Sequence, residues 1–230
     1  MGFNPYFGQF KRRFEFSAVP YGSSKKESFK NAIQENLKDI KYYFYNEIKL
    51  SITIYQNEQK RFETPNYADL DNYSKSICDG LKGFKGILID DCIIQTLDIC
   101  WIDKYPQDYF EIEIKSHPDE YIKKGIKLFE MPDRLFYPIH TDLKNVKETD
   151  VIIFNAIYWQ TKNLKKFAHH LRTVEKRSKI ESYYMSRGLK LILTGFHKTR
   201  IVDSGFDLIK IDDWMKVIKI RGSGQIDTVP

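Results

Sequence analysis

Long apolar segments, paired cysteines and low-complexity tracts are all missing from this sequence of 230 residues. No hydrophobic run approaches the ~20 residues that a membrane-spanning helix needs. The N-terminal residues lack the apolar segment of a secretory signal, and Tyr6 stands where an N-myristoylation motif requires Ser or Thr. We therefore expect a globular, cytoplasmic protein.

Cysteine is scarce, with only three copies at Cys78, Cys92 and Cys100. An odd number without C-x-x-C spacing argues against a disulfide framework and against a zinc site. We expect all three to be small buried hydrophobic residues in a reducing compartment.

Positive charge is distributed unevenly along the chain. The formal net charge is +6, but residues 1–118 contain 16 Lys/Arg and 17 Asp/Glu, whereas residues 119–230 contain 21 and 14. Residues 162–200 alone contain 11 basic and 2 acidic residues. This asymmetry indicates either a polyanionic partner, most commonly nucleic acid, or a well-solvated helix face.

The first half of the chain alternates between short strand-like and helix-like segments. Periodicity, β-branched residues and turn residues predict strands at 10–19, 48–55, 93–103 and 108–116, helices at 28–46 and 70–84, and a loop at 56–67. The first helix would carry an apolar stripe of Phe29, Ile33, Leu37, Ile40 and Phe44. The second is expected to end at Gly80, Gly83 and Gly86. The last two strands are separated by a short turn, which predicts that they pair antiparallel. The order β-α-β-α-β-β predicts an α+β domain with helices on one face of a mixed sheet.

The second half has a weaker pattern. We expect a long basic helical region from about residue 151 to Arg187, a strand at 189–196, and a helix or strand at 211–220. The prolines near 118–132 favour a domain boundary there, so we expect a first domain at 1–120 and a smaller, basic, mixed α/β domain at 121–230.

Acidic residues gather around the segment YADLDNYSKSICDG, residues 67–80. Helical spacing places Leu70, Tyr73, Ile77, Leu81 and Phe84 on one apolar stripe. Asp69 lies just before this helix and Asp71 in its first turn. The pair Asp90 and Asp91 follows the next loop. Asp79, two turns along, is expected to be plain solvated surface.

Carboxylates clustered in this way suit a hard divalent cation such as Mg²⁺, which needs only a few carboxylates plus substrate phosphate. Lys75, one turn after Asp71, can neutralise charge that develops on a phosphate. The spacing alone leaves other interpretations open. A D-x-D pair also occurs in nucleotide-sugar sites, and capping and solvated side chains would explain the same residues structurally. A calcium loop is disfavoured because Tyr73 and Ser74 break its pattern.

The longer pattern ADLDNYSKSICDGLKG…ILIDD, followed by a strand, resembles the signature of RusA-type Holliday-junction resolvases. The resemblance covers about residues 10–116 and implies Asp69, Asp71 and Asp91 as essential carboxylates and metal ligands, with Lys75 as the catalytic lysine. Asp90 matches the less critical member of the acidic pair. Members of this family are homodimeric α+β endodeoxyribonucleases that cut four-way DNA junctions with Mg²⁺ or Mn²⁺. The segment PYGSSKKESF, residues 20–29, matches the family's opening motif only loosely, and the second half of the chain has no counterpart.

Two other patterns have simpler explanations. Glu113 and Lys115, with an upstream Asp90 or Asp91, imitate the PD…(D/E)xK nucleases, but strand alternation with Ile112 and Ile114 facing inward explains them better. His169 and His170 are adjacent on a helix and point about 100° apart, which makes a shared metal unfavourable.

We expect the basic residues to contact the DNA backbone without reading its sequence. The DNA-binding residues expected are Lys82, Lys85, Lys165, Lys166, Arg172, Lys176 and Arg177. We therefore expect an Mg²⁺- or Mn²⁺-dependent endodeoxyribonuclease for branched DNA, cytoplasmic and associated with the nucleoid, and the resemblance implies that it is a homodimer. The alternative is a DNA-binding or interaction protein that keeps the RusA-like fold without cutting.

Overall fold

The computed structural model describes residues 8–63, 69–118, 120–173 and 194–219. The chain forms two compact units, one made of residues 1–124 and 203–205, the other of residues 125–202 and 206–230. Both contain strands and helices, which confirms the predicted α+β class. In the part of the chain described, no helix is both long enough and apolar enough to cross a membrane.

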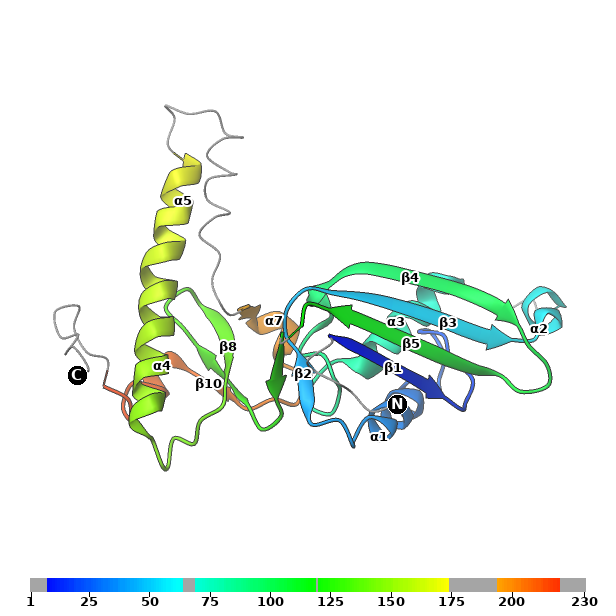
Figure 1. The fold of residues 1–230 in the computed structure, drawn as a ribbon, viewed down its shortest axis with the longest axis horizontal. Coiled ribbons are helices and arrows are strands. Elements are labelled where there is room, and N and C mark those ends of the chain that lie inside the picture. The colour runs from blue at the N-terminus through cyan, green and yellow to red at the C-terminus, as the bar shows by residue number, and fades with distance from the viewer. Residues whose placement is uncertain (1–7, 64–68, 119, 174–193, 220–230) are drawn as a thin grey trace. The chain divides into compact units, whose positions relative to one another are not determined.

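The first unit is built around a four-stranded mixed sheet with the order β1-β5-β3-β4. Its elements in chain order are β1 (Gln9–Phe14), α1 (Lys26–Asn36), β2 (Tyr42–Phe44), β3 (Ile48–Gln56), α2 (Glu58–Glu63), α3 (Leu70–Leu81), the short 3₁₀ helix η2 (Asp91–Ile93), β4 (Ile94–Asp103), β5 (Tyr109–Ser116) and β6 (Tyr121–Lys123). Helices α1 and α3 pack against each other, and both lie on the same side of the sheet (Figure 1).

Strand β3 pairs antiparallel with β5, from Ile48 opposite Ser116 to Tyr55 opposite Tyr109. It pairs parallel with β4 on its other side. The predicted pairing of β4 with β5 is therefore wrong, because β3 lies between them. A parallel neighbour requires a crossover connection, and α3 lies in the connection between β3 and β4.

The side chains of the sheet alternate between a buried face and an open one. Leu50, Ile52, Ile112 and Ile114 are at most 2% exposed, and they lie on the face that packs into the core. Phe14 and Phe110 are register partners whose rings stack with centroids 4.5 Å apart. This alternation follows from the two-residue period of a strand.

Helix α1 is shorter than predicted. It ends at Asn36, and Tyr42–Phe44, which we assigned to the same helix, form β2 and pair antiparallel with β6. Phe29, Ile33, Leu37, Ile40 and Phe44 are nevertheless all buried, as the apolar stripe predicted. The predicted loop at 56–67 contains the short helix α2.

Helix α3 buries Tyr73, Ile77 and Leu81, which confirms the apolar stripe for these positions. Phe84 is an exception: it is 47% exposed because the helix ends at Leu81 and Lys82 adopts an extended backbone. Gly80, expected to help end the helix, lies within it. A Cβ at this position would lie 2.6 Å from Cδ1 of Ile33, so glycine allows α1 and α3 to approach closely.

The second unit contains a four-stranded sheet with the order β10-β7-β8-β9. Its elements are β7 (Lys127–Glu130), β8 (Leu135–Ile139), α4 (Glu148–Trp159), the π-helical segment η3 (Gln160–Leu164), α5 (Lys165–Thr173), β9 (Phe196–His197), α7 (Lys198–Ile201), β10 (Leu208–Ile209) and α8 (Ile211–Trp214). Its core is centred on Phe129, Phe154 and Trp214. The indole N–H of Trp214 donates a hydrogen bond to the carbonyl of Glu130 at 2.8 Å.

Cys78 is buried, and burial raises the pKa of its thiol to about 12. Cys92 and Cys100 are exposed, so the expectation that all three cysteines are buried is wrong. None of the three forms a disulfide bond. Most of the expected strand at 189–196 and the basic residues 174–187 lie outside the described residues.

Candidate active site

The entrance of helix α3 presents two carboxylates to solvent. Asp69 is the last residue before the helix, with an extended backbone (φ −71°, ψ 161°), and its side chain makes no capping hydrogen bond. Asp71 lies in the first turn, and both residues are exposed. The buried stripe of α3 fixes this orientation, because it turns the opposite, charged side of the helix away from the core.

Lys75 lies one turn after Asp71 and is exposed. Its ammonium group is 3.7 Å from the centroid of the Tyr21 ring. The backbone N–H of Tyr21 donates a hydrogen bond to the carbonyl of Asn72 at 3.1 Å, which attaches the segment before α1 to the first turn of α3. Asp69, Asp71 and Lys75 therefore belong to one end of one helix, as predicted.

The acidic pair lies in the turn before β4, and its two members differ in environment. Asp90 is 2% exposed and accepts a hydrogen bond from the backbone N–H of Cys92 at 3.0 Å, which caps η2. Asp91 is partly exposed, and its carboxylate lies 2.9 Å from the ammonium of Lys82.

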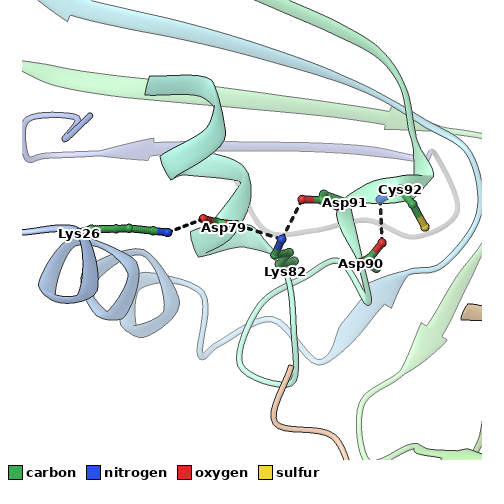
Figure 2. Close-up of polar contacts among 6 residues, drawn as sticks. All are labelled: Lys26, Asp79, Lys82, Asp90, Asp91 and Cys92. Carbon is green, nitrogen blue, oxygen red and sulfur yellow. Dashed lines mark hydrogen bonds and ion pairs between the residues drawn. The ribbon is translucent and has the colours of Figure 1, made fainter. Parts of the chain in front are cut away.

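Figure 2 shows a row of alternating charges that joins α1, α3 and η2. The ammonium of Lys82 lies between the carboxylates of Asp91 and Asp79, 2.9 Å from each. The other carboxylate oxygen of Asp79 is 3.0 Å from the ammonium of Lys26. These four side chains are called the charge row below.

The charge row changes the ionisation of its members. Burial alone would raise the pKa of Asp79, but hydrogen bonds and positive charge from Lys82 and Lys26 hold it below its usual value. Burial would lower the pKa of Lys82, but Asp91 and Asp79 hold it well above its usual value. Each charged form is thus stabilised by its neighbours in the row.

The expectation that Asp79 is plain solvated surface is wrong. Its side chain is only 18% exposed, and it links two lysines. The sequence contains one signal for this, because Lys82 follows Asp79 by three residues, a spacing at which side chains can pair at the end of a helix. Nothing in the sequence indicates Lys26, which is distant along the chain and reaches Asp79 only through the packing of α1 on α3.

Replacing Asp79 by asparagine is expected to lower the free energy of unfolding at pH 7 by about 1–2 kcal/mol, since partial exposure weakens these ion pairs. Because the pKa of Asp79 is lower in the folded state, its contribution is present above the pKa of an unfolded Asp, about 3.9, and is lost as the pH falls through the lower folded value. Urea denaturation at several pH values measures this.

The control for Asp79 is Asp98→Asn on β4, where an exposed carboxylate pairs with Lys49. This change is expected to lower the free energy of unfolding by less than about 0.5 kcal/mol. A loss for Asp79→Asn that is as large at pH 3 as at pH 7 would contradict the assignment.

The structure does not bring Asp91 to Asp69 and Asp71 within the chain. Asp91 is joined through Lys82 to Asp79, which lies eight residues after Asp71, or about 12 Å along the helix axis. Among the residues that the structure describes, no three His, Cys, Asp or Glu side chains form a group that could hold a metal ion. The metal-binding role of Asp91 stays a prediction.

The donor chemistry of the helix entrance nevertheless fits Mg²⁺. Asp69 and Asp71 offer exposed carboxylate oxygens, and Mg²⁺ is commonly bound by one or two carboxylates together with waters and substrate phosphate. The residues therefore fit a cation held by this pair together with substrate phosphate.

The predicted DNA-binding residues occupy different positions. Lys82 is engaged in the charge row, while Lys85 is exposed in the turn after α3. Lys166 is exposed on α5. The side chains of Lys165 and Arg172, and all of Lys176 and Arg177, lie outside what the structure describes. Their contacts with DNA stay predictions.

The competing pattern around Glu113 is explained by the sheet. Its carboxylate accepts a hydrogen bond from the side chain of Gln9 at 2.7 Å and lies 3.3 Å from the ammonium groups of Lys11 and Lys115. Ile112 and Ile114 are buried on the opposite face, as strand alternation predicted. Glu113 therefore belongs to a polar network across β1 and β5.

Comparison with known families agrees with the pattern at α3. Residues 4–115 match the model of the family described as Endodeoxyribonuclease RusA, whereas a search of curated proteins found no match to the chain. The match spans the strands and helices that carry Asp69, Asp71, Lys75 and Asp91. Over residues 4–115, just under half of its length, the chain is therefore similar to the RusA family of endodeoxyribonucleases.

Proposed function

We propose that this protein is a divalent-metal-dependent endodeoxyribonuclease that cleaves four-way junctions or related branched DNA. The observation that carries the proposal is the family match over residues 4–115, together with the exposed Asp69, Asp71 and Lys75 at one end of α3. A helix entrance that presents two carboxylates and a lysine to solvent suits a phosphodiester substrate, because the substrate can approach all three.

In this proposal Asp69 and Asp71 hold Mg²⁺ or Mn²⁺, and Asp91 contributes the third carboxylate. When bound, the cation supplies a Lewis acid for the scissile phosphate and lowers the pKa of a water molecule. Lys75 stabilises the negative charge that develops on the phosphate, because its ammonium lies on the same exposed side of the helix, one turn from Asp71.

The second unit is proposed to hold the DNA backbone. Residues 119–230 have seven more basic than acidic residues, which favours contact with a polyanion. A homodimer is also part of the proposal, since a four-way junction offers equivalent cleavage sites related by a two-fold axis.

The direct test uses labelled four-way junction, replication fork and linear duplex, each incubated with the protein with and without Mg²⁺ or Mn²⁺. We expect cleavage products from the branched substrates only when the metal is present. Equal cleavage of linear duplex would contradict structure selectivity, and metal-independent products would contradict the cation.

A second candidate is a DNA-binding protein that keeps the fold without cutting. The pairing of Asp91 with Lys82 favours it, because the third predicted ligand is engaged elsewhere in the chain. Junction binding without metal-dependent products in the same assay would support this alternative.

A further inference from the structure

Two lysines from distant parts of the chain converge on the ring of Tyr21. The ammonium groups of Lys26, at the start of α1, and Lys75, on α3, each lie 3.7 Å from the ring centroid. The two positive charges are therefore no farther apart than twice this distance. Like charges repel, so this approach requires something that holds each lysine in place.

Backbone hydrogen bonds fix the position of Tyr21. Its N–H donates to the carbonyl of Asn72 in the first turn of α3, at 3.1 Å. The N–H of Ser23 donates to the carbonyl of Pro20 at 3.0 Å, which closes a turn around Tyr21. The ring is therefore positioned beside the helix entrance that carries Asp69 and Asp71.

The charges of the two lysines are balanced differently. Lys26 is paired with Asp79 at 3.0 Å, and Asp79 shares its other oxygen with Lys82. Lys75 makes no ion pair with any of the residues described in the structure; its contact is the Tyr21 ring. Lys26 and Lys82 are thus balanced by Asp79 and Asp91, whereas Lys75 lies outside these ion pairs.

The two lysines also change the pKa of the Tyr21 hydroxyl. Hydrogen bonding and the positive charge of Lys26, followed by the charge of Lys75, lower the pKa of the Tyr21 phenol below its usual value. Both ammonium groups thus act on the same side chain, which indicates a local site for negative charge.

We propose that Lys26 and Lys75, spaced by Tyr21, form a binding site for the DNA backbone phosphate at the position of cleavage. The inference rests on the proposed function, because it takes nucleic acid as the ligand. It adds Tyr21 and Lys26 to the site, and both lie in the segment 20–29 where the sequence matches the family's opening motif only loosely.

A phosphate is a stronger partner for a lysine ammonium than the ring face of Tyr21, which both lysines contact in the free chain. A lysine ammonium has three donors, and a ring face is a weak partner for them in water. Phosphate oxygens accept charge-assisted hydrogen bonds, which are stronger. Lys75 is four residues from Asp71, about 6 Å along the helix axis, so a phosphate held here adjoins the carboxylate pair.

The test measures binding of a fluorescent four-way junction by anisotropy in EDTA, at salt concentrations from 50 to 200 mM. Lys26→Gln is expected to weaken binding several-fold and to make the slope of log K against log salt shallower by about 1, the value for one lost phosphate contact. The matched control is Lys38→Gln. Lys38 is an exposed lysine that follows the end of α1 and pairs with Glu35, so this change removes the same charge. It is expected to leave the slope unchanged.

Variants of Tyr21 test its positioning role. Tyr21→Phe keeps the ring and is expected to bind within about 2-fold of the original protein, whereas Tyr21→Leu is expected to bind about 2- to 5-fold more weakly. In a Lys75→Gln background Tyr21→Leu is expected to add little, because the two side chains act together. Denaturation curves on the same samples show whether each variant is folded.

The outcomes separate this inference from the proposed function. A slope unchanged by Lys26→Gln, in a protein that cleaves junctions with metal, overturns the phosphate site and leaves the nuclease. A shallower slope in a protein that gives no cleavage products supports the phosphate site and contradicts the nuclease. A protein that does not bind DNA overturns both.

Discussion

Replacing Asp71 by asparagine is expected to lower the rate of four-way junction cleavage by about 1,000-fold or more, while junction binding stays within a few-fold of the original protein. Asparagine preserves the size of the side chain but removes its negative charge. If Asp71 is a metal ligand, its loss removes several kcal/mol of transition-state stabilisation, and 1.36 kcal/mol corresponds to a tenfold change in rate. Single-turnover cleavage with Mg²⁺ measures the rate, and anisotropy in EDTA measures binding.

The control for Asp71 is again Asp98→Asn, which makes the same chemical change at an exposed aspartate on β4. Cleavage by this variant is expected to stay within about 2-fold of the original rate, because exposed ion pairs contribute little. If Asp71→Asn retained more than a tenth of the activity, the helix entrance would not be the active site.

Replacing Gly86 by alanine is expected to destabilise the first unit by about 3 kcal/mol, at the upper end of the cost of overpacking. A Cβ at this position would lie 2.1 Å from the carbonyl oxygen of Leu81. That oxygen cannot move freely, because it accepts hydrogen bonds from the N–H groups of Ile87 at 2.8 Å and Leu88 at 3.0 Å. The added methyl group must therefore open the turn that leads to Asp91.

Urea denaturation measures the stability of Gly86→Ala, and Gly22→Ala provides the matched control. At Gly22 a Cβ would meet no atom within 4 Å, so alanine there is expected to change stability by less than about 0.5 kcal/mol. Equal stability of the two variants would show that the turn after α3 has room for a side chain.

Local patterns predicted much of the fold because they depend on neighbours in the chain. The β-branched residues of IKLSITIY, residues 48–55, predicted β3, and the apolar stripe through Tyr73, Ile77 and Leu81 predicted α3. The strand at Tyr42–Phe44 was missed and assigned to a helix. Its partner in the sheet, Tyr121–Lys123, lies far away in the sequence, so no local pattern indicates the pairing. The helical stripe was correct about burial at Phe44 but not about backbone conformation.

A short turn between two strands does not decide whether those strands are neighbours in the sheet. Residues 104–107 favoured a hairpin between β4 and β5, yet β3 occupies the position between them. The succession of β3, α3 and β4 contains the signal for a parallel crossover, because a strand, a helix and a second strand form the usual unit of parallel pairing.

In the candidate site, too, contacts between neighbours in the sequence were predictable and contacts between distant residues were not. Asp69, Asp71 and Lys75 are close in sequence, so helical geometry alone placed them together. Lys26 and Tyr21 reach α3 only through tertiary packing, which no periodicity reports. Asp91 was predicted to meet Asp69 and Asp71, and in the structure it forms an ion pair with Lys82. Charge type was readable from the sequence, whereas the pairing of charges was not.

The position of β1 has a consequence for the making of this protein. Among the strands that the structure describes, Gln9–Phe14 pairs only with β5, so it has no partner until Tyr109–Ser116 has left the ribosome. Strand β3 also has both partners later in the chain. Contacts between distant residues form slowly, because closing long loops costs chain entropy. The sheet is therefore completed from its later strands, and the nascent chain carries unpaired strand edges through much of translation.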